Sequence, residues 1–349
     1  MIEMLRRYFF TIVFLFILLG FIFLSPSGEN DIHQLSGYTM GTTFQLQIVD
    51  MPEGRQPDEI AQEVTELLSE LDIGIFSTYA ADSELSRLNR HEVNVPFIAS
   101  EHLMHVLQQA QSVAILTNGA FDVTVGPLVN LWGFGPTITL QDAVPEQEKI
   151  DAALENVGYE FLVIDPSSSA VRKTREIYVD LSGIAKGYAV DQVAAYFEDM
   201  GVENYFLEIG GELKIKGRKA NGVDWVPAIE APVDGESRVY EIFSNLGDAI
   251  GVAGSGDYRN YFEADGVRYS HEIDPGTGRP VNHNLAAVYV IEKETSIADA
   301  MATAFMVLGV DAGRELAERE NMAVYFIYKT PDSGFAEVIT DGFARYLRQ

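Results

Sequence analysis

The chain has 349 residues, 47% of them hydrophobic and 22% charged, so it is long and apolar enough to bury a substantial core. Its formal net charge of −28 at pH 7 excludes nonspecific binding to nucleic acid, and an anionic ligand would need a metal ion, a lysine or a helix N-terminus nearby. The absence of cysteine excludes disulfide bonds, cysteine-based zinc sites, thiol catalysis and lipidation of a cysteine after a signal sequence.

An apolar segment begins the chain. Arg6 and Arg7 precede an almost unbroken hydrophobic run at residues 8–24. This run is about as long as a membrane span of roughly 17–25 residues, and it lacks the polar face that would favour the alternative, a buried core helix. No small-x-small cleavage site follows, so we expect an uncleaved signal-anchor in residues 1–30 and a globular domain at 31–349. The two arginines predict that this domain lies on the periplasmic side of the inner membrane.

The first half of the chain mixes helical and strand patterns. Apolar residues repeat at helical spacing in three stretches and alternate with polar residues in others. In chain order we expect a linker at 31–36, a strand at 37–50, helices at 57–76 and 100–116, a loop at 131–145, strands at 161–164 and 176–179, and a helix at 184–200.

The second half is mostly strands. We expect them at 205–209, 213–215, 225–229, 239–243, 249–253, 258–263, 267–270 and 286–291, followed by helices at 297–308 and 311–319, a strand at 323–328 and a final strand or helix. This order is not a regular alternation of strand and helix, so a doubly wound parallel sheet is not expected. We predict an α+β fold with mixed, largely antiparallel sheets.

A strand-to-helix corner contains the first candidate site. The sequence Val-Asp-Leu-Ser-Gly-Ile-Ala-Lys-Gly-Tyr at 179–188 ends a strand in a Ser-Gly turn and starts a helix. Free N–H groups at a helix start bind phosphate, and Lys186 lies in the first turn. The pattern is not a Walker A loop, and a structural corner with a surface lysine is the alternative.

A second candidate site lies at 296–303. Asp299 and Thr303 are four residues apart, so they share one face of a helix, and their oxygens suit Mg²⁺. The alternative is a capping box formed by Ser296 and Asp299, which needs no metal.

Further candidates lie at the ends of other elements. His271 follows a strand and precedes the turn sequence Asp-Pro-Gly-Thr-Gly, where it either serves as an acid–base group or only packs. Tyr79 is able to stack on an aromatic ligand, whereas core packing is the favoured alternative for Met40 and Phe121.

Taken together, these motifs resemble one family. Tyr-Thr-Met-Gly-Thr, Phe-Ser-Thr-Tyr, Gly-Ala-Phe-Asp-Val-Thr-Val-Gly-Pro-Leu, Asp-Leu-Ser-Gly-Ile-Ala-Lys-Gly-Tyr-Ala-Val-Asp, Glu-Ile-Gly-Gly-Glu, Gly-Ser-Gly-Asp-Tyr-Arg, His-x-Ile-Asp-Pro and Ala-Asp-Ala-x-Ala-Thr-Ala occur in that order between residues 37 and 308. The chain thus resembles the FAD:protein FMN transferases, the ApbE-like flavin transferases. The resemblance implies a T-fold-like flavin transferase architecture, one Mg²⁺ and bound FAD.

The resemblance also implies roles for individual residues. The Mg²⁺ ligands would be Asp299, Thr303 and the backbone carbonyl of Gly183, with Ala185 as the alternative to Gly183. The flavin nucleotide would contact Met40, Tyr79, Ala120, Phe121, Asp122, Asp180, Lys186, His271 and Ile273. The chain departs from the family in lacking a lipid-anchored cysteine, and in carrying Glu272 where an apolar residue is more usual, which leaves the role of His271 open.

The implied reaction is transfer of FMN. A Thr or Ser hydroxyl of another protein would attack the FMN phosphorus of FAD, and AMP would leave. Lys186 would neutralise phosphate charge, and His271 or a carboxylate near the metal would take the proton. The expected acceptor is a subunit of a membrane redox complex that carries an Asp-Gly-x-(Ser/Thr)-Gly-Ala-Thr-type motif. The alternatives are hydrolysis of FAD to FMN and AMP, and a non-catalytic FAD-binding protein.

Overall fold

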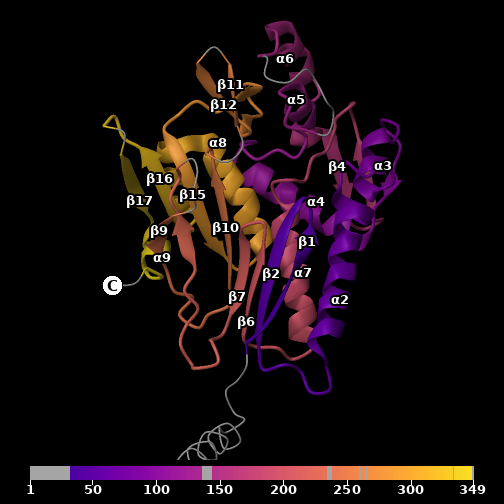
Figure 1. The fold of residues 1–349 in the computed structure, drawn as a ribbon. Coiled ribbons are helices and arrows are strands. Elements are labelled where there is room, and N and C mark those ends of the chain that lie inside the picture. The colour runs from indigo at the N-terminus through magenta and orange to yellow at the C-terminus, as the bar shows by residue number, and fades with distance from the viewer. Residues whose placement is uncertain are drawn as a thin grey trace, which may run out of the picture. The chain divides into compact units, whose positions relative to one another are not determined.

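The computed structural model describes residues 32–135, 144–233, 238–258, 261–264, 266–332 and 334–347 (Figure 1). The apolar run at 8–24 lies outside these residues, so the membrane anchor stays a prediction. The same holds for most of the loop expected at 131–145, because residues 136–143 are not described.

One eight-stranded sheet organises the described chain, and every pair of neighbours in it is antiparallel. Its strands, in spatial order, are β1 (Ile32–Thr39), β2 (Thr42–Val49), β6 (Tyr205–Ile209), β7 (Glu212–Lys216), β10 (Ile250–Gly256), β15 (Leu285–Glu292), β16 (Ala323–Lys329) and β17 (Phe335–Ile339). Alternation sets the faces of these strands, as in β6, where Tyr205, Leu207 and Ile209 are buried. The predicted α+β fold with largely antiparallel sheets is confirmed.

Two helices cover one face of this sheet. Figure 1 shows α7 (Ala185–Asp199) and α8 (Thr295–Arg319) beside each other; α7 packs on β6 and β7, and α8 packs on β10 and β15. The main core lies between these helices and the sheet and includes Phe197 and Phe305. α8 is long and apolar enough to cross a membrane, but most of it is buried as a core helix.

Smaller elements surround this framework. The remaining helices are α2 (Pro57–Ser69), the π-helix η1 (Glu70–Phe76), α3 (Glu84–Arg90), α4 (Glu101–Leu116), α5 (Gly126–Leu131), α6 (Gln147–Leu154), the 3₁₀-helix η2 (Tyr159–Phe161) and α9 (Asp341–Ala344). The minor sheets are β3 (Phe97–Ile98) with β5 (Ala170–Lys173) and β4 (Leu162–Asp165), β8 (Ala228–Glu230) with β9 (Val239–Ile242), β11 (Tyr261–Ala264) with β12 (Val267–Ser270), and β13 (Ile273–Asp274) with β14 (Arg279–Pro280).

Several predicted elements differ from the structure. The single strand expected at 37–50 is the end of β1, a turn at Met40 and Gly41, and β2. The linker expected at 31–36 belongs to β1, an edge strand in which only Leu35 and Thr39 are buried, so its alternation is weak in sequence. The strand expected at 176–179 is reduced to a single bridge between Tyr178 and Val125. The two helices expected after residue 296 are confirmed as the two parts of α8, which are separated by a kink at Gly309; the φ of Gly309, 74°, is outside the helical range.

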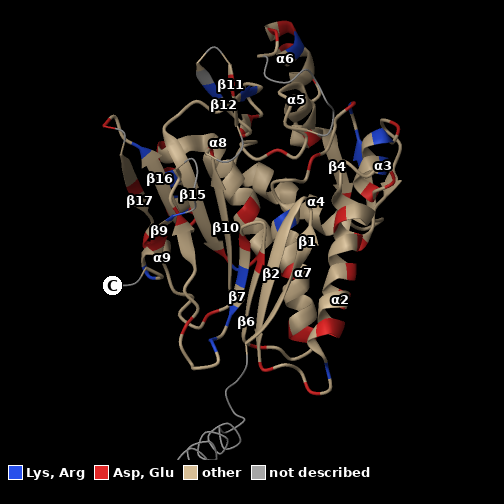
Figure 2. Cartoon of the chain, in the orientation of Figure 1, with Lys and Arg blue, Asp and Glu red and all other residues tan. Residues whose placement is uncertain are grey.

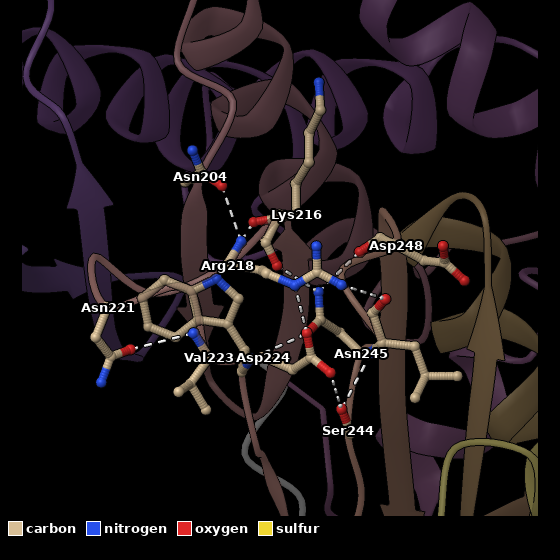
Figure 3. A network of polar contacts seen from close by, with 12 residues as sticks. Asn204, Lys216, Arg218, Asn221, Val223, Asp224, Ser244, Asn245 and Asp248 are labelled. Carbon is tan, nitrogen blue, oxygen red and sulfur yellow. Dashed lines mark hydrogen bonds and ion pairs between the residues drawn. The ribbon is translucent and has the colours of Figure 1, made fainter.

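A polar network fixes the end of β7 that lies away from Glu212 (Figure 3). The buried side chain of Asn245 donates to the carbonyls of Gly217 and Asp248, both at 2.9 Å, and accepts from the N–H of Trp225 at 2.9 Å. Arg218 pairs with Asp224 at 2.8 Å beside it. Because all these backbone groups are satisfied, the loops that follow β7 are held rigidly to the sheet.

Candidate active site

A cavity of about 830 Å³ opens where several strand ends meet the first turns of α7 and α8. Its wall is formed by the β1–β2 turn, the end of η1, the loops before α5, α7 and β13, the glycine of the β6–β7 turn and the glycines of β10. Every residue predicted for the site lines this one cavity: Met40, Tyr79, Ala120, Phe121, Asp122, Asp180, Gly183, Ala185, Lys186, His271, Ile273, Asp299 and Thr303. The fold brings these residues together; what each of them binds stays a prediction.

Lys186 is the one lysine or arginine in the described wall of this cavity. Its Nζ lies 3.0 Å from Glu212 Oε1 and 3.9 Å from Asp299 Oδ1. Burial alone lowers the pKa of Lys186, but the charges of Asp299 and Glu212 outweigh it and raise this pKa above its ordinary value. The lysine therefore stays charged in a molecule whose surface carries acidic residues on α2 and on many other elements (Figure 2). The alternative of a plain surface lysine does not hold.

The N-terminus of α7 is less open than the sequence suggests. The Ser182 N–H donates to Asp180 Oδ1 at 2.8 Å, and the Gly187 N–H donates to Asp299 Oδ2 at 3.0 Å. Carboxylates thus already occupy two of the N–H groups expected to meet phosphate. Lys186 remains as the cation that this corner presents to the cavity.

Asp299, Thr303 and Gly183 lie around one point of the cavity wall. Asp299 is 3% exposed, and a Cβ placed on Gly183 would lie 3.0 Å from Thr303 Oγ1. A carboxylate, a hydroxyl and a backbone carbonyl are the hard oxygen donors that Mg²⁺ takes, so these residues fit the ion. The described residues contain no group of three or more His, Asp or Glu side chains able to hold a metal, so a cation here would depend on the hydroxyl and the carbonyl.

The capping-box alternative for Asp299 is wrong. The carboxylate of Asp191 in α7 caps α8, accepting from the N–H groups of Thr295 at 3.0 Å and Ser296 at 2.9 Å. Asp299 instead reaches across to the Gly187 N–H, and the buried Ser296 hydroxyl has no partner among the described residues. Asp299 is therefore available to the cavity rather than to its own helix start.

His271 stands beside a second carboxylate. Its Nε2 lies 3.4 Å from Glu272 Oε1, and its ring forms a T-shaped contact with Phe134 at a centroid separation of 6.3 Å. Burial raises the pKa of Glu272, and the nearby His271 acts in the opposite direction by lowering this pKa. Glu272, the residue expected to depart from the family pattern, thus contacts the histidine.

The residues expected to contact the flavin lie in different environments. Met40 forms the β1–β2 turn with a φ of 49°, and its N–H donates to Asp72 Oδ2 at 2.8 Å. Tyr79 is 74% exposed at the rim, whereas Phe121 is buried. The carboxylate of Asp122 accepts three hydrogen bonds, from the Thr124 N–H and hydroxyl and from the Tyr159 N–H, so it shapes its own loop.

Three acidic residues of the cavity have no role predicted from the sequence: Asp72, Glu212 and Glu272. Glu212 is 3% exposed, and its Oε2 has no partner among the described residues. The signal in the sequence is its place directly after a Gly-Gly turn at a strand start, in the Glu-Ile-Gly-Gly-Glu motif.

Comparison with known proteins shows which family this chain resembles. The model of the ApbE family matches residues 40–326. The FAD:protein FMN transferase of Vibrio cholerae serotype O1 is 46% identical over 313 residues, covering 90% of this chain and 92% of the relative. The protein of the same name from Haemophilus influenzae is 40% identical, covering 91% and 92%.

Solved structures agree with these sequence relatives. The flavin transferase ApbE from Vibrio cholerae superposes with a TM-score of 0.83 at 44% identity, covering 91% of this chain and 99% of that one. The apo flavinyl transferase ApbE of Pseudomonas stutzeri gives a TM-score of 0.82 at 38% identity, covering 91% and 97%. These similarities extend over nearly the whole described chain.

Proposed function

Because this chain belongs to the ApbE family, and is thus a transferase, we propose that it moves FMN from FAD onto a Thr or Ser hydroxyl of another protein and releases AMP. The observation that carries the proposal is the cavity itself. It joins the buried ion cluster of Lys186, Glu212 and Asp299 to Phe121 and Tyr79, in a chain similar to FAD:protein FMN transferases over 90% of its length.

The proposed reaction breaks one bond of the pyrophosphate. The acceptor oxygen forms a bond to the FMN phosphorus, the bond from that phosphorus to the bridging oxygen breaks, and AMP leaves with this oxygen. Such transfer depends on positioning and charge neutralisation more than on covalent help from the protein. Lys186, fixed by its two carboxylates, supplies positive charge beside the departing phosphate.

Asp299, Thr303 and the carbonyl of Gly183 are the groups proposed to hold Mg²⁺. The ion would supply Lewis-acid neutralisation of the pyrophosphate when bound. The protein supplies the donors at rigid places, because Asp299 is tied to the Gly187 N–H and Thr303 follows it by one turn of α8.

His271 is proposed to take the proton of the acceptor hydroxyl. Its contact with Glu272 at 3.4 Å supports this role, since a neighbouring carboxylate orients an imidazole. FAD itself is proposed to contact Met40, Tyr79, Ala120, Phe121, Asp122, Asp180, Lys186, His271 and Ile273, the residues that line the cavity.

The location follows the same proposal. We propose that residues 8–24 anchor the chain in the inner membrane with the catalytic part in the periplasm, and that the acceptor is a subunit of a membrane redox complex. The arginines before the apolar run support this orientation.

Incubation of the protein with FAD and Mg²⁺, with and without an acceptor, separates the candidate functions. If the protein is a transferase for FMN, flavin should become covalently attached to the acceptor, and AMP should be released only when the acceptor is present. AMP release of equal rate without acceptor would indicate FAD hydrolysis, and FAD that stays intact in both arms would indicate a non-catalytic binding protein.

A further inference from the structure

A second, smaller cavity adjoins the first. It has a volume of about 160 Å³ and shares Gly210, Gly254, Ser255 and Gly256 with the larger one. Ala228 of β8 and Tyr289 of β15 line it on its own side. The two cavities therefore meet at a gap in the main sheet, between the β6–β7 turn and the end of β10.

β10 has an open edge at this gap. β7 pairs with β10 only at Ile250, Gly251 and Val252, although β10 continues to Gly256. No other strand in the described part of the chain takes over this side of β10 beyond Val252. Gly254 is accordingly exposed, even though β10 is a central strand.

The orientation of the open backbone groups follows from the alternation of the strand. Asp257 donates its N–H to Ala286 at 3.1 Å, on the β15 side. Because alternate residues of an antiparallel strand bond to the same neighbour, Ser255 also faces β15, whereas Gly254 and Gly256 direct their N–H and C=O groups to the open side. An unpaired strand edge of this kind is a template for another extended chain.

Two tyrosine rings pack against the glycines of this strand edge. A Cβ placed on Gly254 would lie 2.7 Å from the Tyr289 ring, and one on Gly256 would lie 2.5 Å from the Tyr258 ring. Both rings thus lie against a bare backbone, and both hydroxyls bond to Glu230, with the Tyr258 bond at 2.9 Å and the Tyr289 bond to the Glu230 backbone at 3.1 Å. Glycines within a strand often mark a place where another backbone approaches.

The open edge ends beside the ion cluster. A Cβ on Gly210 would lie 3.3 Å from Lys186 Cδ, and Gly210 lines both cavities. A polypeptide in the gap therefore runs directly into the cavity that contains Lys186.

We propose, resting on the proposed transfer to a protein hydroxyl, that the acceptor polypeptide binds at Gly254 and Gly256 as an extended strand in line with β7. The chemistry that recognises it is main-chain hydrogen bonding at a strand edge. The narrow, ring-walled gap admits small side chains next to the reactive Thr or Ser, which enters the larger cavity.

Amide hydrogen exchange tests the backbone pairing directly. The probe is a synthetic 11-residue peptide with Asp-Gly-Ala-Thr-Gly-Ala-Thr at its centre, added to the full chain in detergent without FAD, and the matched control is the same peptide N-methylated at alternate residues. Slower exchange at Gly254 and Gly256, with Ser255 unchanged and no effect of the control, is the expected result. Modification of the peptide after FAD is added, without any protection of these two amides, would overturn the inference.

A substitution that fills the smaller cavity gives the second test. Ala228 is exposed and lines the smaller cavity but not the larger one. Ala228→Trp should therefore block the smaller cavity without touching the FAD site. Val239→Trp on the neighbouring strand is the control. With the same sequence fused to a carrier protein, Ala228→Trp should raise KM for the carrier about tenfold or more, the loss expected for two backbone hydrogen bonds. FAD affinity should stay unchanged, and the control should behave as the wild type.

The outcomes separate the inference from the function on which it rests. Transfer by Ala228→Trp with the wild-type KM for the carrier would refute binding of the acceptor at Gly254 and Gly256. A loss of FAD affinity as large as the loss of carrier affinity in this variant would refute it too. Failure of the wild-type protein to modify the carrier would refute the proposed function. The proposed binding of the acceptor at Gly254 and Gly256 would then be refuted as well.

Discussion

Lys186 lies between two buried carboxylates, so its charge and its position are both fixed. Glu212 approaches it at 3.0 Å and Asp299 at 3.9 Å, and each carboxylate comes from a different element. Burial raises the pKa of Glu212 and of Asp299, which Lys186 opposes, so the three groups depend on one another. Substitution of the lysine should affect both chemistry and the local charge balance.

Lys186→Met should lower turnover by about 100- to 1,000-fold, because the positive charge beside the phosphates is lost. FAD binding should weaken and become less sensitive to salt, whereas riboflavin, which has no phosphate, should bind equally to both proteins if it binds at all. Steady-state kinetics and fluorescence titration measure these effects. Intact turnover would show that the lysine serves only the fold.

Asp299→Asn separates metal binding from packing. The amide oxygen of asparagine still accepts from the Gly187 N–H, so the α7–α8 contact is kept while the charge is removed. We expect Mg²⁺-dependent transfer to fall about 100-fold or more with little change in Tm. Transfer at the wild-type rate over a Mg²⁺ titration would contradict the role of Asp299 as a ligand.

Site residues that share one helix are easier to predict from the sequence than contacts between residues of different elements. The spacing of Asp299 and Thr303 places them on one face of α8, and the structure brings both to the cavity. Glu212, which follows a strand turn, has no role predicted from the sequence, and Glu272 stands out there only as a departure from the family pattern. The contacts of these residues with Lys186 and His271 are visible only in the structure. The family resemblance, rather than periodicity, placed Met40 and Tyr79.

At the scale of elements, the network around Asn245 holds the far end of β7 and the loops that follow it. Asn245→Ala removes one side chain from three backbone groups and should lower the free energy of unfolding by about 2–3 kcal/mol. The exposed Asn221, which accepts one bond from the Val223 N–H at 3.2 Å, is the matched control, and Asn221→Ala should have little effect. Urea denaturation of both variants checks this, and equal stability of the two would contradict the structural role of the network.

Elements with strong periodicity were predicted closely, and those fixed by distant partners were not. α4 and α7 agree with the helices expected at 100–116 and 184–200 to within one residue at each end. β1 was missed because its inner neighbour, β2, provides its hydrogen bonds while its outer side remains polar. The cap of α8 was misassigned because Asp191, its acceptor, is about a hundred positions earlier in the chain.

At the scale of the whole molecule, the proposed anchor predicts a topology. Protease added to intact spheroplasts should digest the globular part, because residues 8–24 are expected to hold it outside the cytoplasm. A cytoplasmic marker protein in the same cells controls for lysis. Full protection of the globular part would refute the periplasmic location.

The architecture as a whole could be predicted as α+β and antiparallel, but the sheet order could not. Strands β10 and β7 are neighbours although β8 and β9 lie between them in sequence, and this crossover leaves the open edge at Gly254. Such pairing depends on which faces bury against α7 and α8, and a local pattern of residues does not contain that information.

The central claim is that the FMN phosphorus, and no other, passes to the acceptor. FAD labelled with ³²P at either the FMN or the AMP phosphorus, incubated with the protein, Mg²⁺ and a carrier bearing the acceptor motif, tests it most directly. We predict that label from the FMN phosphorus appears on the carrier and that label from the AMP phosphorus appears only in free AMP. AMP-side label on the carrier, or release of both labels with an unmodified carrier, would contradict the account.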